Sequence, residues 1–319
     1  MPRERSAILV HGAIGDDLIA RLRSAHEVVL ADPSSLGPEQ AARIGILVTM
    51  GIMQTDRALM ERLPALGLVC CTGSGFEGVD LAAAAARGIA VTHGPDTNAS
   101  AVADLAMGLL LASVRGVVLA DRFLRQGRWT GNDRDAPPLR QGLTGMRLGI
   151  YGLGTIGLKI ARRAEAFEME VGYHGRRERP GCPYRYAPTL LALAAWADAL
   201  VVAVRAGPGN RHAVDAAVLD ALGPGGHLVN VARGSLVDEP ALIEALRAGR
   251  LGGAGLDVFA REPAVPPGLV ASDRVVLTPH LGGSTTDAHA RMGDLLLANI
   301  RAFLDGRPLP SPVPGPSAG

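Results

Sequence analysis

The sequence predicts an α/β protein built from two doubly wound parallel sheets. Short apolar runs alternate with segments of helical periodicity over residues 6–92 and again after residue 146. Strands and helices in regular alternation form parallel sheets with helices on both faces. A glycine-rich turn with the spacing of a strand-to-helix junction, residues 152–157, opens the second set. At 319 residues the chain has room for two domains of ordinary size.

The first set of elements is expected to form one sheet. The expected strands are 7–10, 28–30, 46–49, 68–71 and 89–91, and the expected helices are 16–24, 40–43, 56–62 and 81–87. In such sheets ligands lie beyond the carboxyl ends of the strands. The loops 50–52 and 72–75 follow two of these ends and are therefore candidate ligand-binding loops.

A long apolar helix is expected between the two sets. It spans residues 100–125, with Asn98 as its N-cap, because Asn side chains accept hydrogen bonds from the first turn of a helix. Its apolar stretch 106–111 predicts burial on several sides, either between domains or at a subunit contact. The segment 126–145, with Trp129, Pro137 and Pro138, is expected to be an irregular packing arm.

The glycine-rich turn has the G-x-G-x-x-G spacing of a dinucleotide site. Gly152 permits the tight turn, Gly154 lets the backbone approach a pyrophosphate, and Gly157 lets the helix lie close to the strand. The helix begins at Thr155 and Ile156, so its free N–H groups face the phosphates. A glycine-rich turn without a nucleotide has the same spacing, so the next strand must supply the context.

The end of the next strand, residues 170–174, predicts which dinucleotide is bound. A site selective for NAD places Asp or Glu there to accept from the ribose 2′-hydroxyl. Here the chain reads His174-Gly175-Arg176-Arg177. Two guanidinium groups can bind an additional 2′-phosphate through bidentate, charge-assisted hydrogen bonds. The predicted cofactor is therefore NADP(H), with NAD(H) possible, and the competing interpretation is a solvated arginine loop.

The second set of elements follows this turn. The expected strands are 148–151, 170–174, 198–204, 227–232, 255–259 and 275–277, and the expected helices are 188–197, 216–222, 240–248 and 284–305. Pro240 suits a first helical position. The Pro-rich tail 308–316 is expected to be mobile.

Composition and charge exclude several classes of function. The composition, 48% hydrophobic and 20% charged residues, provides a substantial core. A net charge of +1 gives no reason to expect nucleic acid or an anionic membrane as the main partner. The longest apolar segment, 105–114, is too short to span a bilayer. Cys70, Cys71 and Cys182 form no disulfide framework or zinc motif, so we expect a cytoplasmic protein without a metal.

Three polar residues of the second set match one chemistry. Reduction of a 2-keto acid by a nicotinamide needs a cation on the carboxylate and carbonyl, an acid for the developing alkoxide, and a carboxylate that keeps this acid protonated. Arg233, His280 and Glu262 match these needs in turn. Each also has a purely structural interpretation, since Arg233 could pair with Asp238 and His280 could be a satisfied strand-end histidine.

Over most of its length the sequence resembles the D-specific 2-hydroxyacid dehydrogenase family, and it looks most like the glyoxylate/hydroxypyruvate reductase branch. The motifs that carry the resemblance are the glycine turn 152–157, Val229-Asn230-Val231-Ala232-Arg233-Gly234 with Asp238-Glu239, Gly255-Leu256-Asp257-Val258-Phe259 with Glu262-Pro263, and Thr278-Pro279-His280. Four motifs in the right order are far more specific than any one. The resemblance implies a Rossmann cofactor domain, residues 100–283, and a flavodoxin-like substrate domain, residues 1–99 and 284–319.

The resemblance also implies a role for each candidate residue. Arg233 would bind and polarise the keto acid, His280 would be the general acid/base, and Glu262 would favour the imidazolium form of His280. Asp257 would hold the nicotinamide carboxamide. The backbone N–H groups expected to bind the substrate carboxylate are those of Gly51, Ile52, Ser74 and Gly75. The expected cofactor-binding residues are Gly152, Gly154, Thr155, Ile156, Gly157, Gly175, Arg176, Arg177, Arg205, Ala232, Asp257 and Gly282.

One segment departs from the family pattern. Residues 205–207 read Arg-Ala-Gly where the family usually shows a Pro-Leu-Thr-like segment beside the adenosine half of the cofactor. Arg205 could add a third positive charge near a 2′-phosphate, or it could be solvated. Gly282 and Gly283 leave room beside the nicotinamide, and the apolar loop 50–53 suits a small aliphatic group on the substrate.

The expected activity is reduction of a small 2-keto acid, such as glyoxylate or hydroxypyruvate, to the D-2-hydroxy acid with NADPH. Domain closure would exclude water. The expected partners are this small molecule and a second copy of the chain in a homodimer, with no nucleic acid and no membrane. The alternative is a non-catalytic NADP(H)-sensing scaffold or corepressor of the same fold. A formate dehydrogenase, which would pair the histidine with Gln instead of Glu262, and a phosphoglycerate dehydrogenase, which often has an added regulatory domain, also remain open.

Overall fold

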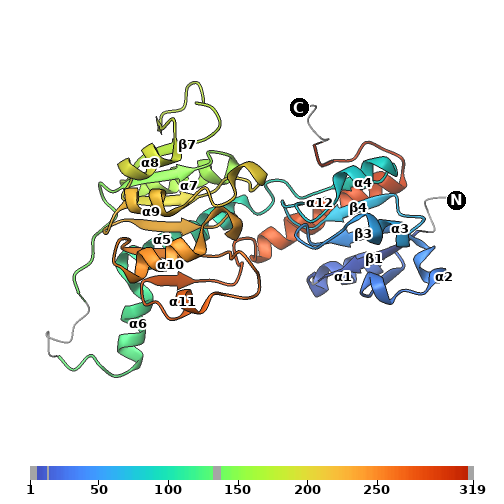
Figure 1. Cartoon of the computed structure of the whole chain (residues 1–319). Helices are drawn as coiled ribbons and strands as arrows, with labels where there is room; N and C mark the ends of the chain where they lie inside the picture. The colour runs from blue at the N-terminus through green and yellow to red at the C-terminus, as the bar shows by residue number, and fades with distance from the viewer. Residues whose placement is uncertain (1–5, 13, 132–137, 315–319) are drawn as a thin grey trace. The chain divides into compact units, whose positions relative to one another are not determined.

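The chain folds into two compact units. The computed structural model describes residues 6–12, 14–131 and 138–314 (Figure 1). Unit 1 comprises Met1–Asn98 and Thr285–Gly319, and unit 2 comprises Ala99–Ser284. Each unit has its own parallel sheet with helices on both faces, which confirms the predicted α/β class.

The sheet of unit 1 has five parallel strands in the order β2-β1-β3-β4-β5. This is the flavodoxin-like order, in which the strand order reverses between β1 and β3. Every residue of β3 is buried, because helices cover both faces of the sheet. The strands are β1 (Ala7–His11), β2 (Val28–Leu30), β3 (Ile44–Thr49), β4 (Leu68–Cys71) and β5 (Ala90–Thr92).

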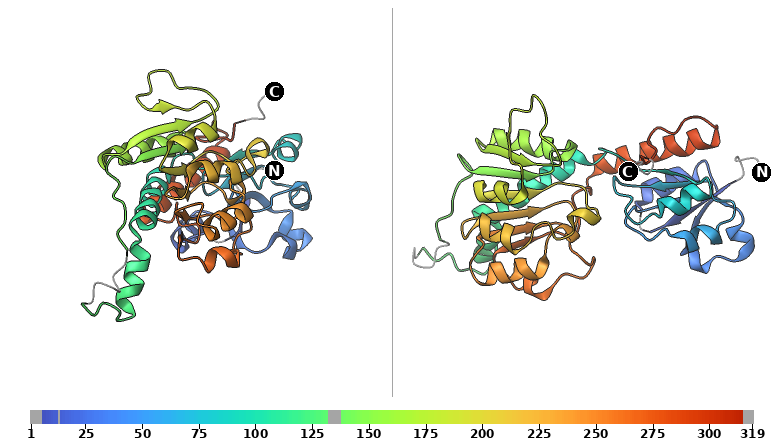
Figure 2. Two further views of the ribbon diagram at one scale, coloured as in Figure 1. Left: turned by 60° about the vertical axis from the view of Figure 1, so that its left-hand side comes forward. Right: turned by 45° about the horizontal axis from the view of Figure 1, so that its top comes forward.

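Two apolar clusters cover the two faces of this sheet. Met60 and Ala83 pack on one face, and Leu22 and Ile300 pack on the other. The helices are α1 (Asp16–Arg23), α2 (Pro38–Ala41), α3 (Arg57–Arg62), α4 (Leu81–Ala86) and α12 (Thr286–Leu304). Helix α12, coloured red in Figure 2, therefore returns the C-terminal part of the chain to unit 1 and packs beside β4.

The segment after α12 is ordered, contrary to the expectation of a mobile tail. Pro312 forms an antiparallel bridge with Thr92, and the N–H of Val313 donates to the carbonyl of Val91 at 2.8 Å. Ser311 is only 7% exposed. The tail pairs here because the outer edge of β5 has backbone groups that no neighbouring strand satisfies. Residues 315–319, including Pro316, lie outside the described part of the chain.

The sheet of unit 2 has seven parallel strands in the order β12-β11-β10-β9-β6-β7-β8. Counted from β6, this is the order of the Rossmann fold with one added strand, and the topological switch point lies between β6 and β9. The strands are β6 (Arg147–Tyr151), β7 (Glu170–His174), β8 (Arg185–Tyr186), β9 (Ala199–Val202), β10 (His227–Asn230), β11 (Gly253–Leu256) and β12 (Val275–Leu277).

The helices of unit 2 also lie on both faces of their sheet. In β9, Leu200 and Val202 face the cluster with α8, α9 and α10, whereas Val201 faces the cluster with α5 and α7. The helices are α5 (Ala99–Arg115), α6 (Val117–Arg125), α7 (Thr155–Ala166), α8 (Leu190–Trp196), α9 (Ala216–Leu222), α10 (Glu239–Arg247) and α11 (Pro267–Val270).

The long helix expected over residues 100–125 is wrong, because the structure has two helices there. Gly116 has a φ of 62° and separates α5 from α6, which are bent by 64°. The N-cap expected at Asn98 is also wrong, since its buried side-chain oxygen has no hydrogen-bond partner among the described residues. Among all the described residues, no single helix is long and apolar enough to cross a membrane. The bent pair α5 and α6 together has the length and composition of such a span. Of the expected arm 126–145, residues 132–137, including Pro137, lie outside the described ranges.

Candidate active site

The glycine-rich turn joins β6 to α7. Gly152 has a φ of 100°, and a Cβ on Gly157 would lie 2.1 Å from the Gly152 carbonyl oxygen, so both positions require glycine. Gly154 is the N-cap of α7 without a side-chain cap, and a Cβ there would meet no atom within 4 Å. The first N–H groups of α7, which include those of Thr155 and Ile156, therefore lie beside open space. These features fit the pyrophosphate of a dinucleotide.

The loop after β7 carries the arginines that the sequence assigns to a 2′-phosphate. His174 is held by a 2.9 Å hydrogen bond between its Nδ1 and the carbonyl of Ala187, and its ring stacks on Tyr151. Gly175 follows, and Arg176 and Arg177 are exposed. The loop is thus anchored at its start and presents two guanidinium groups to solvent.

Sequence reasoning missed a third arginine in this loop. Arg179 donates from its guanidinium to the carbonyl of Leu153, between the first two glycines of the motif. Its backbone N–H donates to the hydroxyl of buried Tyr173 at 2.8 Å. The only signal in the sequence was its place in the arginine-rich run 176–179. Arg205 lies on a different loop, after β9, where it is exposed and its carbonyl accepts from Asn210 at 2.9 Å.

Arg233 follows β10 at a tightly built turn. The carbonyl of Arg233 accepts from Nδ2 of Asn230 at 2.9 Å, and Oδ1 of Asn230 accepts from the N–H of Ala232 at 3.0 Å. Nη1 of Arg233 donates to the carbonyl of Ala232 at 2.7 Å. A Cβ on Gly234 would lie 1.9 Å from the carbonyl carbon of Phe259, so the glycine lets this turn meet the loop that carries Glu262.

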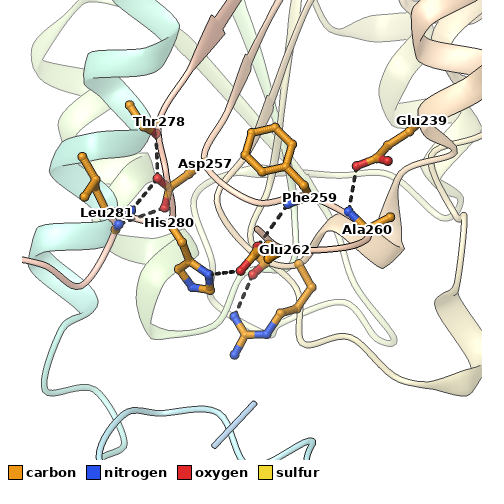
Figure 3. Close-up of polar contacts among 11 residues, drawn as sticks. Glu239, Asp257, Phe259, Ala260, Glu262, Thr278, His280 and Leu281 are labelled. Atoms are coloured by element: carbon orange, nitrogen blue, oxygen red, sulfur yellow. Dashed lines mark hydrogen bonds and ion pairs between the residues drawn. The ribbon is translucent and has the colours of Figure 1, made fainter. Parts of the chain in front are cut away.

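His280 and Glu262 form a hydrogen-bonded pair (Figure 3). Nδ1 of His280 donates to Oε2 of Glu262 at 2.7 Å, and the N–H of Phe259 donates to Oε1 at 3.1 Å. Burial by itself would raise the pKa of Glu262, but the hydrogen bonds from His280 and Phe259 and the nearby Arg233 cation lower it below the ordinary value. The carboxylate is therefore ionised, and Nε2 is the ring nitrogen of His280 that remains for a ligand.

Asp257 holds the loop that carries His280. Asp257 is 1% exposed. Oδ1 accepts from Oγ1 of Thr278 at 2.6 Å and from the N–H of Leu281 at 2.7 Å, and Oδ2 accepts from the N–H of Gly282 at 2.8 Å. His280 lies between these contacts with a φ of 53° (Figure 3). The loop-holding contacts of Asp257 were not foreseen from the sequence, where Thr278 was only part of a motif.

Glu239 holds the loop on the other side of the pair. It is 9% exposed, and its Oε1 accepts from the N–H of Ala260 at 2.7 Å (Figure 3). Asp238, the competing partner of Arg233, caps α10 by accepting from the N–H of Ala241 at 3.1 Å. Within unit 2 the structure therefore brings Arg233, Glu262 and His280 to one place and supports each from a buried polar residue.

The candidate substrate-binding loops lie in unit 1. A Cβ on Gly51 would lie 1.7 Å from the carbonyl oxygen of Gly75, so the two loops touch through backbone atoms and Gly51 cannot carry a side chain. Ile52 is 45% exposed and Ser74 is partly buried. Over residues 6–12, 14–131 and 138–314, no three His, Cys, Asp or Glu side chains form a group that could hold a metal ion.

Comparison with known proteins identifies relatives over nearly the whole chain. The family model described as D-isomer specific 2-hydroxyacid dehydrogenase, NAD binding domain, matches residues 107–282. The hydroxyphenylpyruvate reductase of Plectranthus scutellarioides is 43% identical over 274 residues, 86% of this chain and 87% of that protein. The glyoxylate/hydroxypyruvate reductase A of Arabidopsis thaliana is 43% identical over 258 residues, 81% and 82% of the two chains.

A solved structure matches over a larger share of the chain. The crystal structure of an NADPH-dependent glyoxylate/hydroxypyruvate reductase from Sinorhizobium meliloti, in complex with NADP and malonate, superposes with a TM-score of 0.91. It is 40% identical in sequence, and the match covers 97% of each chain.

Proposed function

This chain belongs to the D-isomer specific 2-hydroxyacid dehydrogenase family, and we propose that it reduces a small 2-keto acid, of the glyoxylate or hydroxypyruvate kind, to the D-2-hydroxy acid with NADPH. As a member of this family it is an NAD(P)-dependent oxidoreductase of 2-hydroxy acids or 2-keto acids. The observation that carries the proposal is the 2.7 Å hydrogen bond between His280 and an ionised Glu262.

In the proposed reaction each residue of the trio has one task. The reduced nicotinamide, when bound, supplies the hydride for the carbonyl carbon. His280 gives the proton on Nε2 to the carbonyl oxygen, so that one hydride and one proton complete the alcohol. Glu262 accepts from Nδ1 and stabilises the imidazolium before this transfer. Arg233 binds the carboxylate and polarises the carbonyl, as guanidinium groups do for planar anions.

The proposal assigns different tasks to the two units. Residues 100–283 would form the cofactor domain, with the glycine turn at the pyrophosphate and Ala232, Asp257 and Gly282 around the nicotinamide. Residues 1–99 with 284–319 would form the substrate domain, whose backbone N–H groups hold the substrate carboxylate. The proposed donors are Gly51, Ile52, Ser74 and Gly75.

Several observations support NADP(H) as the preferred cofactor. Arg176 and Arg177 are exposed at the carboxyl end of β7, where an NAD-selective site places a carboxylate. Arg179 adds a guanidinium beside the glycine turn. The relative from S. meliloti is described as NADPH-dependent and was crystallised with NADP. Arg205, exposed after β9, is a further candidate for the same phosphate.

We further propose a homodimer in the cytoplasm. Helix α6 exposes Val117, Val118 and Leu124, and Leu139 is fully exposed, so this part of unit 2 offers apolar surface to a second copy. The buried cysteines of β4 are free thiols, as expected in a reducing compartment. Sedimentation velocity of the wild type and of a Val117→Glu/Leu124→Glu variant tests this proposal. A monomeric wild type would refute the dimer, and a dimeric variant would refute the contact through α6.

The direct test of the activity is a substrate panel. Purified protein is mixed with NADPH or NADH and with glyoxylate, hydroxypyruvate, hydroxyphenylpyruvate or 2-ketogluconate, the last two because relatives carry those names. We expect oxidation of NADPH with the small keto acids and a D-configured product by chiral chromatography. Binding of NADPH without turnover on any member of the panel would refute the reductase and favour the sensing scaffold or corepressor.

A further inference from the structure

We propose that His93 is a positioning residue, held in place by the C-terminal segment, that aims backbone amides of unit 1 at the carboxylate of the substrate. The inference deepens the proposed function and rests on it. In the proposed function, four backbone N–H groups bind that carboxylate. In all four cases the carbonyl of the same peptide unit is already held by another hydrogen bond. The carbonyls are those of Met50, Gly51, Gly73 and Ser74.

A held carbonyl determines the direction of the neighbouring N–H. The peptide unit is planar and trans, so its C=O and N–H point in opposite directions. The N–H of Gly78 donates to the carbonyl of Gly51 at 2.8 Å, which sets the direction of the Ile52 N–H. The N–H of Gly94 donates to the carbonyl of Gly73 at 2.8 Å, which likewise sets the N–H of Ser74.

The last of these peptide units is held by a side chain. Nδ1 of His93 lies 3.0 Å from the carbonyl oxygen of Ser74. A carbonyl can only accept, so Nδ1 carries a proton and donates in this contact. The N–H of Gly75 then points away from His93. A carbonyl that accepts a hydrogen bond also polarises its own peptide unit, which makes the Gly75 N–H a stronger donor to an anion.

His93 itself is fixed from the end of the chain. Oγ of Ser311 donates to the His93 carbonyl at 2.6 Å, and the His93 N–H donates to the Ser311 carbonyl at 3.2 Å. Nδ2 of Asn299, on α12, donates to Oγ of Ser311 at 2.8 Å. Asn299 is 1% exposed, and the His93 ring meets Phe76 edge to face at 5.1 Å. The C-terminal segment therefore holds the backbone of His93, and the imidazole contacts Phe76 and the carbonyl of Ser74 in the substrate loop.

This arrangement links a distant part of the chain to the backbone N–H groups proposed to bind the substrate carboxylate. Residues 311–313 pair with β5, β5 leads directly into His93, and His93 holds the loop 73–75. If His93 had only a structural role, it would contribute to folding stability and leave substrate binding unchanged once the protein is folded. A positioning residue would change KM for the keto acid while the affinity for NADPH stays constant.

A matched pair of variants separates these roles. His93→Asn keeps a nitrogen donor on Cγ, and His93→Leu has carbons of similar reach there. Loss of one hydrogen bond of this kind predicts a KM for glyoxylate raised about fivefold in His93→Leu, and a KM near that of the wild type in His93→Asn. Kd for NADPH is expected to stay within about twofold in both, because unit 2 is untouched. The control is His289→Leu, which replaces an exposed histidine of unit 1. Equal KM values in His93→Leu and the wild type would overturn the inference, and so would equal increases in the two His93 variants.

A second readout does not depend on turnover. In ¹H–¹⁵N spectra of the NADPH-bound protein, titration with oxamate is expected to shift the Gly75 amide in the wild type and in His93→Asn, and much less in His93→Leu. An unchanged Gly75 response in His93→Leu would overturn the inference. If the wild type reduces no keto acid of the panel, the proposed function fails, and the oxamate titration still decides whether His93 orients this amide. Should His93→Leu fail to fold, Ser311→Ala removes the hydroxyl that donates to the His93 carbonyl and accepts from Asn299. This variant is expected to raise KM about twofold, whereas an unchanged KM would count against the inference.

Discussion

Replacement of Glu262 by Gln tests the central pair of the site. The variant keeps the size of the side chain and one acceptor oxygen in place of two, which Nδ1 of His280 can use, and it removes the negative charge 2.7 Å from that nitrogen. A hydrogen bond to a charged group contributes about 1.5–3 kcal/mol and a neutral one about 0.5–1.5 kcal/mol, so the imidazolium loses about 1.2 kcal/mol. One pH unit corresponds to 1.36 kcal/mol, and the alkaline limb of the reduction profile should therefore move about one unit to lower pH.

The alkaline limb moves to lower pH because of the protonation states of His280 and Glu262. The reduction step needs the imidazolium, and an ionised Glu262 favours it. Because the pKa of Glu262 lies below its ordinary value, the carboxylate stays ionised until the pH falls through that lowered value. The stabilisation of the pair is thus present at neutral pH in the wild type and absent in the variant at every pH.

The assay is kcat/KM for NADPH-dependent reduction of glyoxylate from about pH 5 to 9, around the range in which histidine titrates. Glu244→Gln is the control, because it neutralises an exposed glutamate that pairs with Arg247 on α10. We expect the control to leave the profile in place. Superimposable profiles for Glu262→Gln and the wild type would refute the reasoning.

Three further predictions concern the cofactor site and stability. Replacing Arg176 and Arg177 by Ser should raise KM for NADPH at least about tenfold and leave KM for NADH unchanged; equal effects on both cofactors would contradict the 2′-phosphate assignment. Gly154→Ala should melt near the wild-type temperature, since its Cβ meets no protein atom, yet bind NADPH weakly, since that Cβ enters the proposed pyrophosphate space. Gly157→Ala should lose thermal stability, because its Cβ lies 2.1 Å from a carbonyl oxygen. Calorimetry and NADPH titration distinguish the two variants. Burial and the nearby Arg140 lower the pKa of His227 to about 4, so the unfolded chain binds more protons and the free energy of unfolding should fall as the pH drops from about 6.5 to 4. In denaturant titrations, the free energy of unfolding of His227→Gln should fall less over this pH range. An equal fall in the variant and the wild type would contradict this prediction.

Local pattern sufficed for most of the secondary structure. Strands buried on both faces are continuous apolar runs, and helices between them show amphipathic spacing, so the expected elements of both sheets are found within a few residues of their predicted bounds. Strand β8, Arg185–Tyr186, was missed because two residues are too short to show a period. The break at Gly116 was missed because a single glycine is tolerated inside a helical pattern.

In the candidate site, too, the sequence predicted the local features and missed the contacts between distant residues. The types and order of Arg233, Glu262 and His280 were visible in short motifs, because turns that place functional side chains at strand ends have strong local requirements. Their mutual contacts were not visible, since Glu262 and His280 are 18 residues apart and the pairing depends on where the loops after β11 and β12 meet. Arg179 carried no motif of its own, and its contact with Leu153 depends on how the loop after β7 folds back.

The sequence by itself determined the two α/β sets, the dinucleotide turn and the identity of the polar trio, because each depends on residues close together in the chain. Tertiary structure alone decided that Asp257 holds the His280 loop, that the helix breaks at Gly116, and that Ser311 reaches His93 across 218 positions. Such contacts form between side chains and free backbone groups brought together by sheet packing. No local period or spacing encodes which distant partner will satisfy them.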